Sequence, residues 1–238
     1  MLVKSQVKYI QSLGQKKFRD EEGAFVVEGP KMVRELLQAP NLALLHLFAL
    51  SSFRDAGVPF TEVKEGELEK ISFLATPNQV LAVFRKPVFA APDHDHRVSL
   101  VLDGIQDPGN LGTIVRIADW FGVGQVVCTP DSADVFSPKA IQSTMGSISR
   151  VQVLYEDPLR LMDLHPDLPV YAAVLEGKSI FEQPRVTKGW IVIGNESKGI
   201  RGELLQRSTH PITIPRIGEA ESLNAAVATG IILSHLVR

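Results

Sequence analysis

The 238-residue sequence contains a single cysteine, Cys128, so no disulfide can form within the chain. Because Cys128 follows two valines in an apolar run, we expect a small buried packing residue and not a reactive thiol. The N-terminal residues lack the apolar stretch of a signal peptide, and no segment approaches the ~18 consecutive apolar residues of a membrane span. The sequence therefore predicts a soluble, cytoplasmic protein with no membrane partner.

The motifs that identify common α/β enzymes are also absent. The turn after the apolar run at 98–102 has no G-x-G-x-x-G pattern, and Pro108 would disturb a tight phosphate-binding turn. The sequence has no phosphate loop of the form G-x-x-x-x-G-K-[ST] and no G-x-S-x-G nucleophile turn. These absences argue against a dinucleotide oxidoreductase, a P-loop enzyme and an α/β-hydrolase.

Metal-ligand spacing is missing as well. The alternating Asp and His residues at 93–96 are neighbours in sequence, and neighbouring side chains point in different directions, whereas a metal needs converging ligands. We therefore expect a solvated linker here and no metal site.

Charge gives only a local signal. With 25 Lys and Arg against 27 Asp and Glu, the net charge is −2, so the whole-protein field gives no argument for nucleic acid. The exception is the N-terminal segment, in which five basic residues precede the first acid: Lys4, Lys8, Lys16, Lys17 and Arg19. This segment is either an ordinary solvated helix face or a surface that contacts RNA phosphates.

The composition divides the chain into a domain at 1–90, a linker at 91–97 and a domain at 98–238. In the first part, strand patterns at 24–28, 44–50 and 80–84 and a helical pattern at 31–37 indicate a small α/β unit. In the second, helical segments at 110–121 and 138–145 separate apolar runs, which lie at 98–102, 125–128, 151–154, 170–175, 190–193 and 212–214. This alternation predicts an α/β domain with a parallel sheet.

Three polar clusters, at 107–116, 193–200 and 214–228, each begin where a predicted strand ends. The carboxyl ends of parallel strands are where α/β proteins bind ligands, so the three together indicate a site. Each residue also has a purely structural interpretation. Asn110 and Ser222 suit helix N-caps, Arg116 suits a solvated helix face, and Glu196 suits the start of a helical turn.

The clusters read D-P-G-N-L-G-T-I-V-R, I-G-N-E-S-K-G-I and I-P-R-I-G-E-A-E-S-L-N-A-A-V-A. In order, spacing and residue type they resemble the three signature motifs of the SpoU family, in the SPOUT class of RNA methyltransferases. The resemblance covers essentially all of 98–238. F-V-V-E-G-P-K-M-V-R-E-L-L at 25–37 resembles the substrate-binding domain of two-domain members. Ser197, where many members carry glycine, and Gly109 are small departures.

The resemblance implies a C-terminal α/β domain closed by a trefoil knot, behind a smaller N-terminal α/β RNA-binding domain. It implies that S-adenosylmethionine donates a methyl group to a ribose 2′-hydroxyl of structured RNA, ribosomal RNA first and transfer RNA second. It also implies a homodimer whose active site combines two subunits. Carried over by position, the catalytic set is Asn110, Arg116, Glu196, Ser222 and Asn224, and the cofactor-binding set is Gly194, Ile214 and Leu223.

The roles follow from the chemistry of an in-line displacement. Because the guanidinium of Arg116 is always protonated, we expect it to stabilise the developing alkoxide or hold a phosphate, and not to act as a base. Glu196 would position Arg116 or accept the proton. Two other hypotheses are an RNA-binding module that has lost catalysis and an unrelated nucleotide-using α/β enzyme. The intact polar set disfavours the first, and the missing phosphate loop disfavours the second.

Overall fold

The computed structural model describes residues 2–53 and 57–237 of the chain. The chain forms two compact units. The first comprises Met1–Phe89 together with Asp134–Ser149, and the second comprises Ala90–Ala133 together with Arg150–Arg238. The segment Asp134–Ser149 thus belongs to the first unit although it lies within 98–238.

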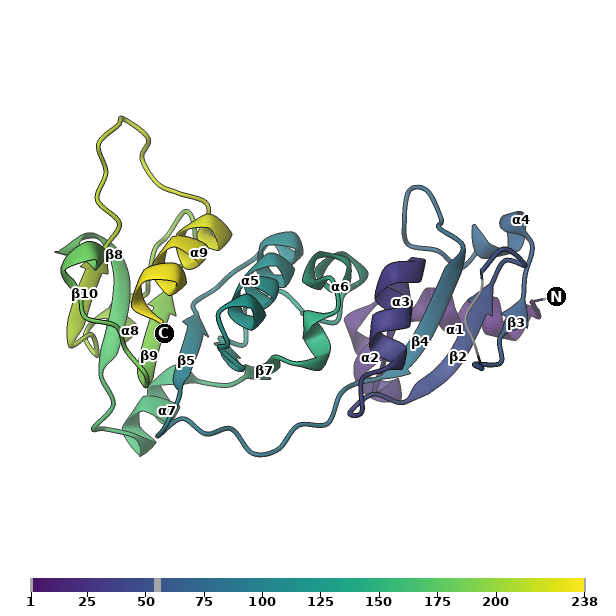
Figure 1. The fold of residues 1–238 in the computed structure, drawn as a ribbon, viewed down its shortest axis with the longest axis horizontal. Helices are drawn as coiled ribbons and strands as arrows, with labels where there is room; N and C mark the ends of the chain where they lie inside the picture. Colours follow the sequence, from purple (N-terminus) through teal and green to yellow (C-terminus); the bar gives the residue numbers. More distant parts are fainter. Residues whose placement is uncertain (1, 54–56, 238) are drawn as a thin grey trace. The chain divides into compact units, whose positions relative to one another are not determined.

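The first unit is built on a four-stranded sheet in the order β1-β4-β2-β3 (Figure 1). Its strands are β1 (Ala24–Glu28), β2 (Leu44–Ala49), β3 (Thr61–Glu62) and β4 (Val80–Arg85). Strand β4 pairs antiparallel with β1 and β2, and β3 pairs parallel with β2. The helices are α1 (Lys4–Ser12), α2 (Lys16–Glu22), α3 (Pro30–Leu37) and α4 (Glu65–Leu68). The sequence did not predict β3, because its two residues are exposed and carry no apolar pattern.

The segment Asp134–Ser149 contributes helix α6 (Pro138–Thr144) and the 3-10 turn η1 (Ser147–Ser149) to this unit. Its first residue, Asp134, accepts hydrogen bonds at Oδ2 from Nε and Nη2 of Arg19, at 3.0 and 2.6 Å. Nη1 of Arg19 donates to the carbonyl of Leu13 at 2.7 Å, and the Arg19 side chain is only 3% exposed. The rings of Phe136 and Phe25 pack with centroids 5.2 Å apart.

The prediction that Arg19 contacts RNA is corrected by this arrangement. All three nitrogens of its guanidinium donate inside the unit, and the side chain is buried. The four lysines predicted with it, Lys4, Lys8, Lys16 and Lys17, are exposed at α1 and at the start of α2.

The second unit holds a six-stranded sheet in the order β10-β8-β9-β5-β6-β7, and every neighbouring pair is parallel. The strands are β5 (Val98–Leu102), β6 (Gln125–Cys128), β7 (Gln152–Tyr155), β8 (Val170–Ser179), β9 (Gly189–Ile193) and β10 (His210–Thr213). The helices are α5 (Pro108–Trp120), α7 (Pro158–Leu164), α8 (Gly202–Leu205) and α9 (Ala225–Leu236), with a 3-10 turn η2 (Ile180–Glu182). The predicted α/β class and parallel sheet are confirmed.

The order of the strands in this sheet reverses between β5 and β9. These strands are neighbours, with Leu102 opposite Ile193, while β6 and β7 extend to one side and β8 and β10 to the other (Figure 1). Such a reversal of strand order opens a crevice at the carboxyl ends of the strands. The segments that begin at Asp103 and Gly194 therefore leave the sheet side by side.

Two helix starts differ from the sequence expectation. Helix α5 begins at Pro108, and its N-cap is Asp107, whose Oδ1 accepts the N–H of Asn110 at 2.9 Å. Helix α9 is capped by Asn224 and not by Ser222. Because Asp107 takes the capping role, the side chain of Asn110 is free for other contacts.

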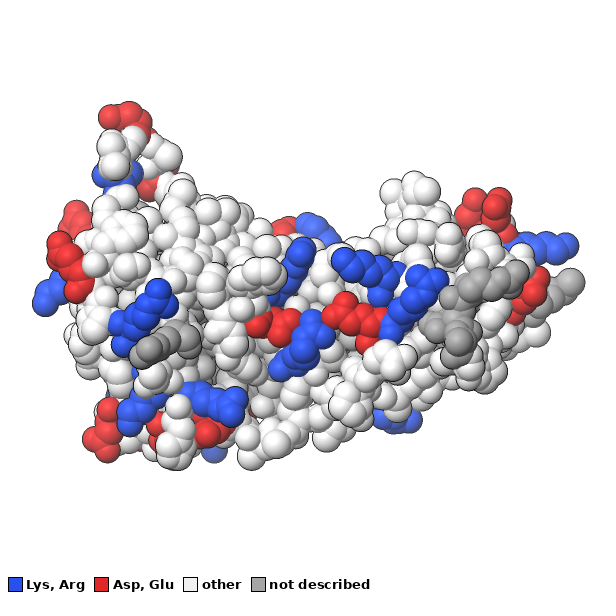
Figure 2. Space-filling model, in the orientation of Figure 1, with Lys and Arg blue, Asp and Glu red and all other residues white. Residues whose placement is uncertain are grey.

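Cys128 is fully buried, as predicted, and burial raises the pKa of its thiol. On the face drawn in Figure 2, basic and acidic side chains are interspersed. None of the helices in the described part of the chain is long and apolar enough to cross a membrane. Within residues 2–53 and 57–237, no group of three or more His, Cys, Asp or Glu side chains is arranged to hold a metal.

Candidate active site

Polar side chains from the three motifs meet at the carboxyl edge of the second unit's sheet. Oε1 of Glu196 accepts a hydrogen bond from Nδ2 of Asn110 at 2.6 Å and from Nδ2 of Asn224 at 2.9 Å. Nδ2 of Asn224 also donates to Oδ1 of Asn110 at 3.1 Å. Along the chain, Glu196 lies 86 positions and Asn224 lies 114 positions after Asn110. The structure therefore joins one residue from each motif in a single cluster.

Two members of this cluster, Glu196 and Asn224, have further hydrogen-bond partners at the start of α9. Oε1 of Glu196 also accepts the backbone N–H of Ala225 at 3.2 Å, at the start of α9. Oδ1 of Asn224 accepts the N–H groups of Ala226 and Val227 at 3.0 and 3.3 Å, which caps the same helix. The capping bonds and the cluster bonds use opposite ends of one amide, so the start of α9 fixes the orientation of Asn224.

Two members of the predicted catalytic set lie outside the cluster. Arg116 is exposed on α5, and its side chain makes no hydrogen bond or ion pair among residues 2–53 and 57–237. It follows Asn110 by six residues, or about 9 Å along the helix and about 240° around it. Ser222 is exposed in the loop before α9.

A cavity of about 700 Å³ lies beside the cluster, and Glu196 lines it. The three residues predicted to bind the cofactor, Gly194, Ile214 and Leu223, line it too, as does Ser222. Leu205 and Leu223 are 40% and 44% exposed on its wall. Apolar side chains that remain exposed in a concave, partly polar cavity are typical of a small-molecule site.

Position 194 requires glycine because there is no room for a Cβ, and not because of the backbone conformation. A Cβ at this position would lie 2.4 Å from the carbonyl carbon of Gly199 and 2.5 Å from the nitrogen of Ile200. Both are backbone atoms of the loop that carries Glu196, so a larger residue would push that loop outward.

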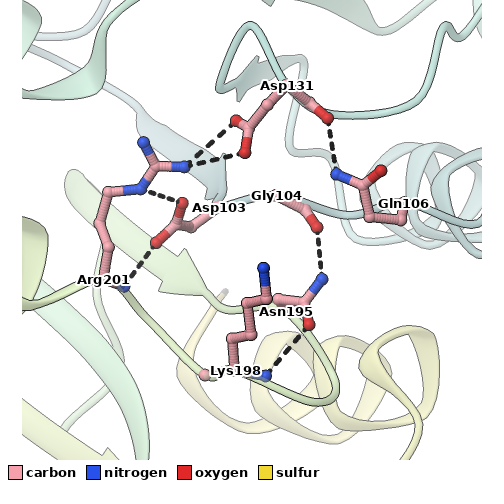
Figure 3. Close-up of a pocket in the computed structure, with 8 residues that line it drawn as sticks. Asp103, Gly104, Gln106, Asp131, Asn195, Lys198 and Arg201 are labelled. Atoms are coloured by element: carbon pink, nitrogen blue, oxygen red, sulfur yellow. Dashed lines mark hydrogen bonds and ion pairs between the residues drawn. The ribbon is translucent and has the colours of Figure 1, made fainter.

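A second pocket, of about 420 Å³, adjoins the same loop, and sequence reasoning missed it. Figure 3 shows its frame: the carboxylate of Asp103 accepts the backbone N–H and Nε of Arg201 at 2.7 and 2.6 Å. Nη2 of Arg201 reaches both oxygens of Asp131, at 3.1 and 3.3 Å. Hydrogen bonds from Thr129 and from Arg201 hold the pKa of Asp131 below its ordinary value. The available signal was Asp103 itself, a carboxylate directly after a buried strand.

The two pockets share the loop that follows β9. Asn195, Lys198 and Gly199 line both of them. Nδ2 of Asn195 donates to the carbonyl of Gly104 at 2.6 Å, and its Oδ1 accepts the N–H groups of Ser197 and Lys198. The loop is thereby tied to the turn after β5, and Glu196 of the same loop lines the larger cavity.

Comparison with known proteins agrees with this geometry. The model of the SpoU rRNA Methylase family matches residues 97–234, and the model of the MRM3-like substrate binding domain matches residues 4–82. Among curated proteins, the chain is 31% identical to the 23S rRNA (guanosine(2553)-2′-O)-methyltransferase RlmP of Bacillus subtilis, over 97% of this chain and 95% of that one.

Two solved structures share the whole fold. One is a protein assigned to the TrmH family of RNA methyltransferases from Porphyromonas gingivalis. It is 39% identical with a TM-score of 0.89, over 100% of this chain and 98% of that one. The other is the AdoMet-bound rRNA methyltransferase from Sinorhizobium meliloti. It is 28% identical with a TM-score of 0.86, over 99% and 95% of the two chains. The chain therefore belongs to the SpoU rRNA methylase family.

Proposed function

We propose that this chain is an S-adenosylmethionine-dependent ribosomal RNA methyltransferase that modifies a ribose 2′-hydroxyl. The observation that carries the proposal is the junction of Asn110, Glu196 and Asn224 at the edge of a cavity fit for the cofactor. The relatives support it, since RlmP is a 23S rRNA 2′-O-methyltransferase and the Sinorhizobium meliloti structure holds AdoMet. We infer that the protein acts in the cytoplasm.

The cavity fits the cofactor by size and by chemistry. Its volume of about 700 Å³ and its exposed leucines suit an adenosine, and the Glu196 carboxylate suits a positively charged sulfonium. Gly194, Ile214 and Leu223 would hold the bound group, which supplies an activated methyl. We also propose that the segment after β9 forms the trefoil knot that the family resemblance implies.

The chain's own residues must align the ribose and help its hydroxyl lose a proton. We assign alignment to Asn110 and Asn224, whose amides Glu196 holds in place, and to Ser222 at the cavity wall. Oε1 of Glu196 accepts three hydrogen bonds, and Oε2 has no partner among the described residues. We therefore assign Oε2 as the proton acceptor, which replaces the alternative role of positioning Arg116.

We propose that the N-terminal domain, residues 1–90, binds the RNA. Its match to a substrate-binding domain supports this role, and Lys4, Lys8, Lys16 and Lys17 present exposed side chains there. Ammonium groups that neutralise phosphates release counterions, so binding through them should weaken steeply with salt.

A homodimer would bring Arg116 of one subunit to the Asn110–Glu196–Asn224 cluster of its partner. Among residues 2–53 and 57–237, Arg116 makes no hydrogen bond or ion pair with Asn110 or Glu196, whereas Trp120, one turn further along α5, is 82% exposed. Val227 on α9 is 51% exposed. A large aromatic side chain on the surface beside an unpaired arginine is typical of the centre of a protein interface. We propose that Arg116 of each subunit completes the site of its partner.

Substitution of Arg116 by alanine should lower single-turnover methylation more than about tenfold, because one charge-assisted contact to the developing alkoxide is lost. AdoMet affinity should stay within about twofold, since Arg116 does not line the cavity. The matched control is Arg160→Ala, which removes an exposed arginine from α7. Near wild-type methylation by Arg116→Ala would remove this residue from the mechanism.

A mixture of the inactive variants Arg116→Ala and Glu196→Ala should regain activity if the site is shared between subunits. Random exchange gives half heterodimers, each with one intact site, so about a quarter of all sites recover. Methylation is measured before and after subunit exchange, and light scattering confirms the dimer. Failure to regain any activity would place both residues in the same chain's site.

The function itself is tested by mapping 2′-O-methyl groups in ribosomal RNA from cells with and without the gene. One ribosomal ribose methyl group should disappear with the gene and return with the wild-type copy. The alternative of a catalytically inactive RNA-binding module predicts identical maps.

A further inference from the structure

Three aromatic rings form a row that runs from the core of the first unit to its surface. The ring of His46 stacks on that of Phe48, with centroids 6.0 Å and planes 28° apart. Phe48 is buried, whereas His46 is exposed. The ring of Tyr9 on α1 lies 5.8 Å from the His46 ring, in a T-shaped arrangement. The outer end of this row therefore presents aromatic surface to solvent.

His46 stands on the less buried half of β2. The first three residues of β2 are not fully buried, and β3 pairs with its last two residues. On the other side of β2, His46 lies opposite Val83 of β4, and Arg85 follows Val83 by two residues. Because side chains alternate along a strand, Arg85 and His46 project from the same face of the sheet. Helix α1, which carries Tyr9, packs on this face (Figure 1).

The polar groups of these side chains remain available for a ligand. The Tyr9 hydroxyl, the His46 ring nitrogens and the Arg85 guanidinium have no hydrogen bond or ion pair among residues 2–53 and 57–237. Burial and the nearby Glu22 carboxylate raise the pKa of Tyr9, and Arg85 opposes this shift. The Tyr9 hydroxyl is therefore protonated at neutral pH, and together with Arg85 it offers hydrogen-bond donors beside the rings.

Cations predominate around the rings. Arg85 is exposed, and the exposed Lys8 is the neighbour of Tyr9 along α1. Lys4 lies one turn before Lys8 on the same side of this helix. Against these three cations stands the Glu22 carboxylate, which also lies near Tyr9. The local balance of charge therefore favours an anionic partner.

Stacking rings, free donors and cations together suit unpaired nucleotides of RNA. Every base has a flat π-face that stacks on histidine, tyrosine or an arginine guanidinium, while lysines contact the phosphates. In a duplex the bases cover each other's faces, so such a surface would distinguish single strands from paired ones. The centre of a protein–protein interface, by contrast, is depleted of charged residues.

We infer that Tyr9, His46 and Arg85 form a stacking site for an unpaired nucleotide of the RNA substrate. The inference rests on the proposed function and deepens it, because it adds base contacts to the phosphate contacts of the lysines. It is supported by the match of residues 4–82 to a substrate binding domain, which includes Tyr9 and His46. The stacking contacts do not depend on the identity of the base.

Binding of short RNAs to the full-length protein tests the site without methyl transfer. The probes are a labelled single strand of about 12 nucleotides and the same strand annealed to its complement. Fluorescence anisotropy gives both dissociation constants. His46→Ala should weaken binding of the single strand at least about fivefold, because one base loses its stacking partner, and should leave duplex binding within about twofold. Unchanged affinity for the single strand, or an equal loss for both probes, overturns the inference.

Two further variants separate stacking from other effects. His46→Phe keeps an aromatic ring, so its affinity for the single strand should stay within about twofold of wild type. His210→Ala removes another exposed histidine, which stacks on Tyr171 at 4.8 Å and 29° in the second unit, and should likewise bind as wild type does. Circular dichroism verifies that each variant is folded. A loss of about fivefold in His46→Phe or in His210→Ala overturns the assignment of His46.

Methylation kinetics separate this inference from the function on which it rests. Ribosomal RNA from cells without the gene is methylated with labelled AdoMet by the wild type and by His46→Ala. The variant should raise the KM for RNA at least about fivefold and keep kcat within about twofold, because the site binds RNA away from the reacting atoms. Wild-type KM in the variant overturns the stacking site and leaves the function standing. Absence of label, with the single-strand defect of His46→Ala intact, would contradict the function and leave the site standing.

Discussion

Replacing Gly194 by alanine should weaken AdoMet binding at least about tenfold and lower methyl transfer about 100-fold. The added methyl group would lie 2.4 Å from a backbone carbon of Gly199, where ordinary contacts begin near 3.4 Å. The loop must therefore move by about 1 Å, and it carries both a wall of the cofactor cavity and Glu196. A displacement of this size is enough to misalign the cofactor and the cluster together.

The control for this variant is Gly218→Ala. Gly218 lines the same cavity, but a Cβ built there meets no atom within 4 Å, so binding should stay within about twofold of wild type. AdoMet affinity is measured by calorimetry, and circular dichroism verifies that both variants are folded. Wild-type affinity in a folded Gly194→Ala protein would show that the close backbone approach does not shape the site.

Replacing Arg19 by alanine should lower the free energy of unfolding of the first unit by about 3–5 kcal/mol, because Asp134 is left buried without its partner. The pair is 3% and 10% exposed and sits where Asp134–Ser149 joins the N-terminal residues. Loss of Arg19 also leaves the carbonyl of Leu13 without its donor. The effect should appear in urea denaturation, with no requirement for RNA.

Lys17→Ala is the matched control, because Lys17 lies on the same helix and its pair with Glu21 is exposed and 3.9 Å long. Loss of the Lys17–Glu21 pair should lower the free energy of unfolding by less than about 1 kcal/mol. The double variant Arg19→Ala with Asp134→Ala should lose less free energy of unfolding than the sum of the two single variants. The second change removes the carboxylate that is otherwise buried without a partner. Full additivity would contradict the buried pair.

Much of the second unit was predictable because its strands are buried on both faces and separated by helices. Apolar runs such as 98–102 therefore located the parallel strands directly. The polar motifs that follow those strands indicated that Asn110, Glu196 and Asn224 would lie together, whereas Arg116 and Ser222, predicted with them, lie outside the cluster. The start of α5 was missed although its signal was present: Asp107-Pro108 has the same cap-then-proline form as Ser137-Pro138, which correctly marked α6.

Long-range pairing was not predictable in the same way. Nothing local distinguishes Arg19 from Lys16 and Lys17, and only the position of Asp134, 115 residues away, turns it from a surface cation into a buried one. The second pocket depends likewise on Asp103 meeting Arg201 across 98 residues. Patterns within a short window report burial and periodicity, but they carry no information about such partners.

The most direct test of the central claim is the chemical position of the methyl group that the purified protein transfers. Ribosomal RNA lacking the modification is incubated with labelled AdoMet and then hydrolysed with alkali, which requires a free 2′-hydroxyl to cleave each phosphodiester. We expect the label in an alkali-resistant dinucleotide, and we expect it to vanish in the Glu196→Ala variant. Label recovered in ordinary mononucleotides would mean methylation of a base and would contradict the account.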